Sequence, residues 1–191
     1  MPDAMLFLEE FFAPQEVTRL QQFAQDHESR FVPSQVLNDD EAGHRDEDVR
    51  RSSVLFDVDE IRPLVTERVL AAYPWVMARL RQPLFDVRDI ELQVTSSNDG
   101  EWFKPHRDSG ADAVGSRTLT FVYYCHLEPR AFSGGELRMF LPPDGDSVTI
   151  VPPQNSIVFF PSHQLHEVLP VHCPSGRLAD SRLTVNGWLH R

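Results

Sequence analysis

The sequence contains only two cysteines, Cys125 and Cys173, among its 191 residues. Two cysteines do not make a disulfide framework, so we expect two unpaired thiols and a reducing, cytoplasmic location. The sequence also lacks any run of about 18 apolar residues, and we therefore expect no membrane-spanning helix and no membrane partner. The opening residues, MPDAMLFLEEFF, have acids within the apolar run and no basic lead, which is not the pattern of a secretory signal.

Basic residues are scarce as well. The sequence has 18 Lys and Arg against 29 Asp and Glu, which gives a formal net charge of −11. Binding to nucleic acid needs clustered cations that face the phosphates, so we expect no nucleic-acid partner. The acidity favours a neutral or basic substrate only weakly, because acidic residues are also a common source of solubility.

The remaining composition, 41% hydrophobic and 25% charged, is that of an ordinary globular protein. A chain of 191 residues suffices for one domain with a substantial core, and no repeat or low-complexity linker divides it. We therefore interpret residues 1–191 as a single domain, with helical support over 1–88 and a β-rich core over 89–191.

Two helices are predicted in the N-terminal third. The first begins at Pro14, a residue that suits the first helical position, and apolar residues then recur about one turn apart. A similar apolar stripe follows Asp59, and Pro74 is expected to break or kink that second helix. The two stripes consist of Val17, Leu20 and Phe23 and of Ile61, Leu64, Val65 and Val69.

The segment Gln35–Arg51 between these helices has almost no apolar residues and is rich in acids. It cannot bury itself, so it is predicted to be a mobile loop. Two interpretations remain open, a solvated surface loop and a lid over the substrate, because long loops in compact domains are often functional. The acids are Asp39, Asp40, Glu41, Asp46, Glu47 and Asp48.

From Asp89 onward the pattern changes to short β-strands separated by turn signals such as Ser133-Gly134-Gly135. Strands are predicted around 90–94, 118–125, 136–140, 148–151, 156–160, 166–171 and 182–189. Short strands at this spacing are typical of a sandwich or barrel. The predicted fold is mainly β with N-terminal helices, a jelly roll with the helices packed outside.

His106 and Asp108 form the first candidate for chemistry. At positions i and i+2 of an extended segment their side chains point to the same side of the chain, and Arg107 faces away. A third metal ligand is expected from a strand that is distant in sequence, and His166, which opens a strand just after a turn, is the candidate. His163 lies nearby in the preceding loop and is interpreted as a surface residue or a residue behind the ligands.

Two imidazoles and one carboxylate with open coordination positions are the facial triad of non-haem iron(II). Zinc accepts the same ligands, so His106, Asp108 and His166 alone do not decide the metal. A zinc-dependent cupin-like enzyme therefore remains an alternative.

The last predicted strand carries polar side chains on one face, with Arg182 and Thr184 both on it and Leu183 on the other. A buried guanidinium is costly unless it has a partner or ligand, and it suits bidentate recognition of a carboxylate. Thr184 would add a hydroxyl to the same oxygen, and Tyr124 on the strand at 118–125 would donate its phenol. The alternative is an internal salt bridge from Arg182 to an acidic residue.

Five motifs in this order resemble the prolyl 4-hydroxylase group of 2-oxoglutarate oxygenases, especially the hypoxia-sensing prolyl hydroxylases and their bacterial relatives. The resemblance covers roughly residues 89–190. The motifs are the His-x-Asp pair at 106–108, RTLTFVYY at 117–124, SGGELR at 133–138, HEVLPV at 166–171 and RLTVNGW at 182–188.

The resemblance implies a double-stranded β-helix, iron(II) on His106, Asp108 and His166, and 2-oxoglutarate held by Arg182 and Tyr124. It implies a dioxygenase that uses O2 and releases succinate and CO2, with ascorbate as a further candidate cofactor. The substrate would be a prolyl or other residue of a protein or peptide, or an amino-acid-like small molecule.

Two departures from the family pattern concern the co-substrate and the substrate. Ser96 stands where the hypoxia sensors carry a Tyr on the strand before the metal motif, so one co-substrate contact is expected to be missing. The stretch before Arg182 is longer than usual, which leaves Arg177 as a less favoured carboxylate partner. The rival function from another class is a non-catalytic jelly-roll module that senses metal or 2-oxoglutarate without turnover.

Overall fold

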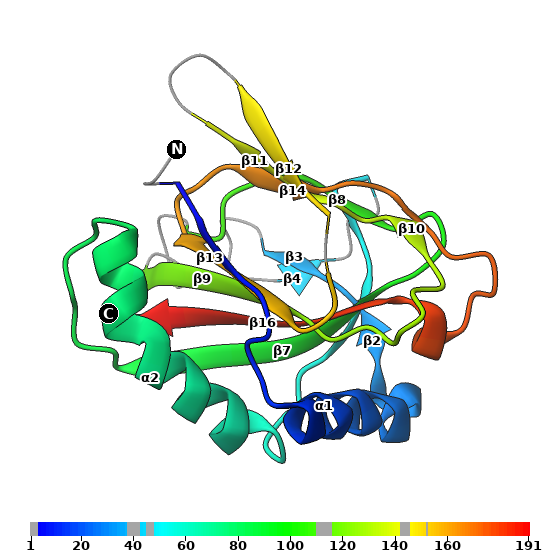
Figure 1. Ribbon diagram of the computed structural model, residues 1–191. Coiled ribbons are helices and arrows are strands. Elements are labelled where there is room, and N and C mark those ends of the chain that lie inside the picture. The colour runs from blue at the N-terminus through cyan, green and yellow to red at the C-terminus, as the bar shows by residue number, and fades with distance from the viewer. Residues whose placement is uncertain (1–3, 38–42, 45–47, 110–115, 142–145, 152) are drawn as a thin grey trace.

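Two antiparallel β-sheets face each other in the computed structural model, and two helices cover the outer face of the larger sheet (Figure 1). The structure describes residues 4–37, 43–44, 48–109, 116–141, 146–151 and 153–191. The architecture is the predicted one, mainly β with the helices in the N-terminal part.

The larger sheet has seven strands in the order β1-β13-β9-β16-β7-β6-β2. The long strands β7, β9 and β16 lie at its centre, and β16 pairs with both of the others in antiparallel register. The bounds are β1 Leu6–Leu8, β2 Val32–Pro33, β6 Ser53–Leu55, β7 Asp89–Ser97, β9 Arg117–Tyr124, β13 Ser156–Pro161 and β16 Arg182–His190.

The smaller sheet has five strands in the order β12-β11-β14-β8-β5, and two short pairs accompany it. Strand β10 pairs with β15, and β3 pairs with β4. The sheet consists of β5 Arg50–Arg51, β8 Trp102–His106, β11 Leu137–Phe140, β12 Ser147–Ile150 and β14 His166–Val168. The pairs consist of β3 Val36–Leu37, β4 Gly43–His44, β10 Ser133–Gly134 and β15 Val171–His172.

The helices are α1 Pro14–Asp26 and α2 Arg62–Arg79, with short 3-10 turns at Glu28–Arg30 and Leu178–Asp180. Helix α1 begins at Pro14 as predicted, and its apolar stripe is buried. Of the two expectations for Pro74, a break in the second helix was wrong, because α2 continues past Pro74 to Arg79, and a kink stays a prediction. A proline removes one hydrogen bond of the helix, and burial of Tyr73, Val76 and Met77 on either side of it compensates for that loss.

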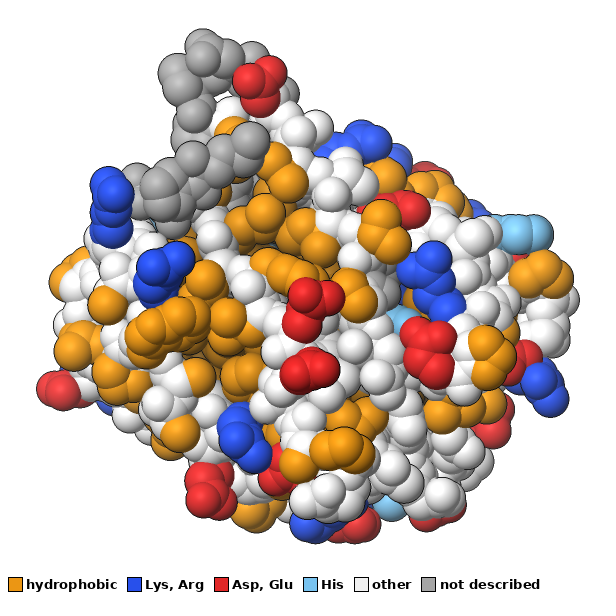
Figure 2. Space-filling view, in the orientation of Figure 1, with side chains coloured by type: hydrophobic (Ala, Val, Ile, Leu, Met, Phe, Trp, Pro, Cys, Tyr) orange, Lys and Arg blue, Asp and Glu red, His pale blue; other side chains and the backbone are white. Residues whose placement is uncertain are grey.

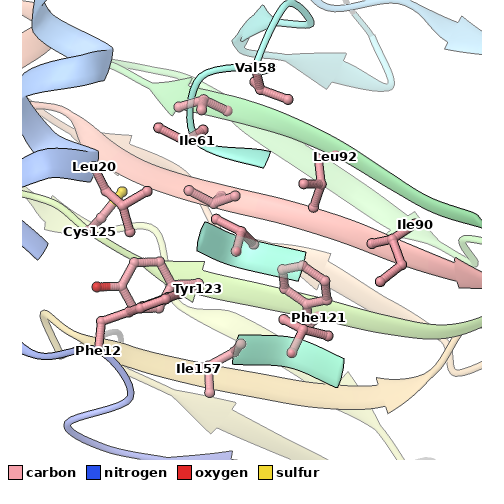
Figure 3. Packing of buried hydrophobic residues seen from close by; sticks show 14 of the residues in the cluster. Phe12, Leu20, Val58, Ile61, Ile90, Leu92, Phe121, Tyr123, Cys125 and Ile157 are labelled. Atoms are coloured by element: carbon pink, nitrogen blue, oxygen red, sulfur yellow. The ribbon is translucent and has the colours of Figure 1, made fainter. Parts of the chain in front are cut away.

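The period-two alternation of the central strands sorts side chains between two apolar clusters. Phe121 and Tyr123 of β9 point to the helices and pack with residues such as Leu20 and Phe12 (Figure 3). Val122 and Tyr124 of the same strand point to the smaller sheet. Figure 2 shows hydrophobic side chains gathered toward the middle of the face that Figure 1 presents, with charged side chains mostly around them.

Two sequence predictions need correction. The segment Gln35–Arg51 was predicted to be a mobile loop without strands of its own being expected, but the short strands β3, β4 and β5 lie within it. The acids at 39–41 and 46–47 lie outside the described residues, so the choice between a surface loop and a lid stays open. The predicted strand at 166–171 is divided into β14 and β15, because Pro170 lies between them and cannot donate to a ladder. No helix in the described ranges has the length and apolarity to cross a bilayer.

Candidate active site

The three predicted metal ligands meet at one end of the smaller sheet. His106 ends β8 and His166 begins β14, and the two are paired directly across the antiparallel ladder. Asp108 follows β8, with its Oδ1 3.6 Å from His106 Nε2 and its Oδ2 3.7 Å from His166 Nε2. One ligand atom from each residue lies within 4.8 Å of the others, so a single ion can contact all three.

Each imidazole is oriented by a backbone carbonyl. His106 Nδ1 lies 2.8 Å from the Lys104 carbonyl oxygen, and His166 Nδ1 lies 2.9 Å from that of Gln164. A ring whose Nδ1–H donates to a carbonyl presents a bare Nε2 lone pair, which is the usual arrangement behind a metal-binding histidine. The donor set therefore fits a divalent metal ion.

Aromatic rings hold both imidazoles in place. Phe103 stacks on His106 with centroids 3.4 Å apart and an interplanar angle of 13°. Phe160 meets His166 edge-on at 4.7 Å. These contacts restrict ring rotation, so the ligands are positioned before a metal arrives.

Burial sets the protonation states that a metal requires. Burial lowers the pKa of His166 to about 4, His106 lowers it further, and Asp108 opposes the change. Burial by itself raises the pKa of Asp108, but His166 and His106 outweigh that effect and bring the pKa well below its ordinary value. At neutral pH the site therefore offers a neutral imidazole and an ionised carboxylate, which are the ligating forms.

Asp108 is held by groups from the larger sheet and from the residue that follows its strand β13. Thr120 Oγ1 lies 2.9 Å from Asp108 Oδ2, and the Asp108 amide donates to the Ser162 carbonyl at 2.9 Å. The Trp188 indole also helps to lower the pKa of Asp108, although its N–H makes no hydrogen bond of normal geometry among the described residues. Sequence reasoning missed the contact of Thr120 with Asp108, because it depends on the packing of β9 against the segment after β8.

Arg182 begins β16 and is only 3% exposed between the sheets. Its Nε donates to the Gly135 carbonyl oxygen at 2.6 Å, and its Nη2 lies 3.5 Å from the Tyr124 hydroxyl. Burial lowers the pKa of the guanidinium, and Tyr124 and the more distant Glu136 oppose this, but an arginine remains a cation. The guanidinium forms no ion pair with any described carboxylate, so the alternative of an internal salt bridge finds no support in this part of the chain.

The neighbours of Arg182 differ in how they suit a carboxylate ligand. Burial raises the pKa of the Tyr124 phenol, which stays protonated and able to donate a hydrogen bond. Thr184 faces the same interior, but its hydroxyl lies 3.4 Å from the Thr95 carbonyl oxygen. Arg177, the less favoured alternative, is exposed and pairs with Asp180 through Nη2 at 2.7 Å. The structure therefore brings Arg182 and Tyr124 together and leaves Arg177 outside.

Two further residues singled out in the sequence lie away from the site. The Ser96 side chain does not face Arg182. Its hydroxyl donates to Ser181 Oγ at 2.8 Å, and it lies on the same face of β7 as the apolar residues of that strand that pack against the helices. The residue of β7 opposite Arg182 in register is Ser97. His163 is exposed between β13 and β14, as predicted, and its carbonyl accepts a hydrogen bond from Arg107.

Strand β9 connects the two halves of the candidate site. Its inner face carries Thr120, which contacts Asp108, and Tyr124, which contacts Arg182. Four residues of extended chain separate their Cα atoms by roughly 13 Å. The metal-ligand cluster and the buried cation therefore lie along one strand of the same interior.

Comparisons with known proteins agree with this geometry. Residues 92–190 match the model of the 2OG-Fe(II) oxygenase superfamily. An uncharacterized PKHD-type hydroxylase from Synechocystis sp. is 36% identical over 96% of this chain, and the chain spans 62% of that relative's length.

Solved structures share the fold. A prolyl-4-hydroxylase from Pseudomonas putida superposes with a TM-score of 0.72 at 23% identity, covering 99% of this chain and 93% of that one. A prolyl hydroxylase from Trichoplax adhaerens, in complex with a hypoxia inducible factor oxygen degradation domain peptide fragment, gives a TM-score of 0.74 at 17% identity, covering 98% and 84%. The facing sheets are thus the predicted double-stranded β-helix, and the chain belongs to the 2OG-Fe(II) oxygenase superfamily.

Proposed function

We propose that the protein is an iron(II)- and 2-oxoglutarate-dependent dioxygenase that hydroxylates a C–H bond. The observation that carries the proposal is the direct cross-strand pairing of His106 with His166, with the Asp108 carboxylate within 3.7 Å of both Nε2 atoms. Membership of the superfamily supports iron over zinc for this ligand set.

Each group would have a distinct role. His106, Asp108 and His166 would hold iron(II), and Arg182 and Tyr124 would bind the carboxylate of 2-oxoglutarate that lies farther from the metal. Thr184 would join them only if its hydroxyl turned away from the Thr95 carbonyl oxygen. Charge-assisted bonds to a buried guanidinium are stronger and more directional than neutral ones, so Arg182 would set the orientation of the co-substrate.

When bound, iron(II) with 2-oxoglutarate and O2 would supply the oxidising chemistry, with release of succinate and CO2 and transfer of one oxygen atom to the substrate. The protein would contribute positioning and exclusion of water. Arg182 and Asp108 are nearly fully buried, and the imidazoles are fixed by carbonyls and by Phe103 and Phe160.

The proposed substrate is a prolyl or other residue of a protein or peptide, or an amino-acid-like small molecule, with ascorbate as a candidate auxiliary reductant. The peptide bound to the Trichoplax prolyl hydroxylase supports the peptide alternative by analogy of fold.

The test adds iron(II) and then 2-oxoglutarate to the metal-free protein without oxygen, and records the visible charge-transfer band of the chelate. We expect a band that requires both additions, disappears in His106→Ala and weakens in Arg182→Gln, with Arg177→Gln as the matched control. Metal binding without such a band in the wild type would overturn the proposal and favour a non-catalytic binding module. Release of succinate on admission of oxygen then distinguishes turnover from binding.

A further inference from the structure

A small polar cavity lies beside the metal ligands, at the edge where the two sheets meet. The chain leaves the smaller sheet at β5 and enters the larger one at β6, with Ser52 between them. The cavity has a volume of about 120 Å³, which suits one functional group of a ligand better than a whole molecule. It is lined by Pro33, Ser34, Arg50, Arg51, Ser52, Ser53 and Glu101.

Arg50 supplies the cavity with a half-buried cation. Its Nε donates to Ser52 Oγ at 3.0 Å, and its guanidinium lies 4.7 Å from the centre of the Phe103 ring. Burial lowers its pKa to about 10, while Asp108 and Glu101 act in the opposite direction at longer range. Arg50 forms no ion pair with a described carboxylate, so its terminal nitrogens have unused capacity to bind an anion.

Ser34 gives an independent indication of a ligand. Its side chain lines the cavity and is only 3% exposed, yet its hydroxyl has no hydrogen-bond partner among the residues that the structure describes. Its backbone is satisfied, since the Ser34 amide donates to the Ser52 carbonyl at 2.9 Å. A buried hydroxyl without a partner costs about 1–3 kcal/mol, a cost that an acceptor in the cavity would remove.

The charged side chains around the cavity favour an anion, although the lining contains an acidic residue as well as basic ones. Arg50 and Arg51 contribute two cations, and Arg51 stacks on Trp102 with its guanidinium 4.5 Å from the ring centre. Glu101 contributes one carboxylate, and its Oε2 accepts a hydrogen bond from the Asn98 amide at 2.7 Å. The Arg50 guanidinium, with the Ser34 hydroxyl beside it as a donor, matches a carboxylate better than a neutral group.

The cavity is close to the metal ligands through the ladder of β5 and β8. Arg50 is paired with Phe103, and Phe103 stacks on His106. Contacts of 4.7 Å and 3.4 Å in series place the Arg50 guanidinium within about 8 Å of the centre of the His106 imidazole. A group held by Arg50 would therefore fix a neighbouring C–H bond near the metal.

We propose that this cavity is a substrate subsite that binds a carboxylate, with Arg50 as the charged partner and Ser34 as a hydrogen-bond donor. That the bound group belongs to a substrate rests on the proposed oxygenase function, but binding of a carboxylate in the cavity can be measured without iron. The carboxylate has two possible sources, the free carboxyl of an amino-acid-like substrate or an acidic side chain beside the hydroxylated residue of a peptide.

The first experiment titrates the metal-free protein with propionate and with propionamide, a neutral molecule of the same shape, and follows the backbone amides by two-dimensional NMR. We expect propionate to shift the amides of Ser34, Arg50 and Ser52, and propionamide to bind at least tenfold more weakly. Arg50→Gln should weaken propionate binding at least tenfold and Ser34→Ala severalfold. Arg79→Gln, which removes an exposed guanidinium 5.8 Å from the Trp75 ring centre, is the matched control and should bind normally.

Arg182 is a second cation to which propionate could bind, so the Arg182→Gln variant decides between that site and the Arg50 cavity. Propionate shifts that survive in Arg182→Gln and disappear in Arg50→Gln support the subsite. The opposite pattern, equal binding of propionamide, or no shift at Ser34 and Ser52 would overturn it. The comparison of propionate with propionamide uses the wild-type protein, so it does not depend on whether any variant folds.

The second experiment separates the two sources and the two proposals. Succinate release by the iron-loaded enzyme is compared for free L-proline, L-prolinamide and peptides in which proline has an acidic or a neutral neighbour. If only free proline stimulates succinate release, the carboxylate is that of an amino-acid-like substrate. If only the acidic peptide does, it is an acidic side chain of a peptide. In either case the stimulation should fall at least tenfold in Arg50→Gln. The charge-transfer band keeps the two proposals apart. Propionate shifts without the band would remove the oxygenase function and leave the subsite, whereas the band without the shifts would remove only the subsite.

Discussion

Thr120 Oγ1 lies 2.9 Å from Asp108 Oδ2, so a residue of the larger sheet orients a metal-ligand candidate that follows a strand of the smaller one. The same hydroxyl is 2.9 Å from Ser162 Oγ, which gives it an acceptor on one side and a donor on the other. The carboxylate is thus held from the larger sheet, although the backbone of Asp108 continues from β8 of the smaller one.

Replacement of Thr120 by Val should therefore weaken metal binding. The change removes the hydroxyl and keeps the shape, and loss of such a group behind a ligand typically costs 10–100-fold in metal affinity. Titration with iron(II) or cobalt(II) measures it. Thr118→Val is the control, because among the described residues the Thr118 hydroxyl donates to the Ser116 carbonyl oxygen alone, at 3.1 Å. Equal affinities of the two variants would contradict the prediction.

Arg182→Gln should reduce the affinity for 2-oxoglutarate by about 30-fold or more, since loss of one partner of a buried charge pair costs roughly 2 kcal/mol or more. Tyr124→Phe should have a smaller effect, because it removes one neutral donor. Calorimetry on the metal-loaded protein measures both. Arg177→Gln should bind the co-substrate normally, and an equal loss in that variant would return the role to Arg177.

Gly135→Ala should also impair 2-oxoglutarate binding, although the residue has no side chain. A Cβ at Gly135 would lie 2.6 Å from Arg182 Cδ and 2.9 Å from Val171 Cγ2, so the guanidinium would be displaced. The left-handed backbone, with φ +68, adds roughly 1–3 kcal/mol of strain. Gly176→Ala is the control, because Gly176 has a similar φ of +66 and a Cβ there would have nothing within 4 Å. This variant should be less stable but should bind 2-oxoglutarate with unchanged affinity.

His126 should make the metal-free protein sensitive to acid. Its side chain is 1% exposed, and neither ring nitrogen makes a hydrogen bond of normal geometry among the described residues, although Glu128 Oε1 lies 3.5 Å from Nε2. Burial lowers the pKa of His126 to about 4, and Glu128 only partly opposes this. The unfolded chain takes up a proton near pH 6.5 and the folded chain only near pH 4, so stability falls as the pH drops through this window. The difference amounts to about 3 kcal/mol for this residue.

In His126→Leu that part of the acid sensitivity should disappear. Urea unfolding at several pH values measures it, and His172→Leu is the control because that ring is exposed. His166 contributes in the same direction, so the loss of stability should shrink rather than vanish. An unchanged pH dependence in His126→Leu would contradict the assignment.

The sequence was most informative where the side-chain period and the chemistry agreed. The inward face of the last strand predicted Arg182 beside Tyr124, because a guanidinium on a buried face needs a ligand. The metal ligands were predicted from residue type and strand position, and the cross-strand register brings them together.

Other features depended on contacts between distant segments. The continuation of α2 through Pro74 reflects tertiary burial, which local propensity does not contain. Counting residues back from His106 reached Ser96, whose side chain is on the other face of β7 from Ser97. Arg50 was passed over within an acidic segment, because only pairing with β8 places it on Phe103.

The pairing of His106 with His166 limits how this chain can change in length. Side chains alternate between the faces of a strand, so deleting one residue within β8 would turn the following ligand to the opposite face and shift its partner. Substitutions along β8 alter contacts one at a time, whereas a single insertion or deletion there would dismantle the ligand set at once. Homologues that keep the metal should therefore vary in length in the turns, and their β8 segments should align without gaps.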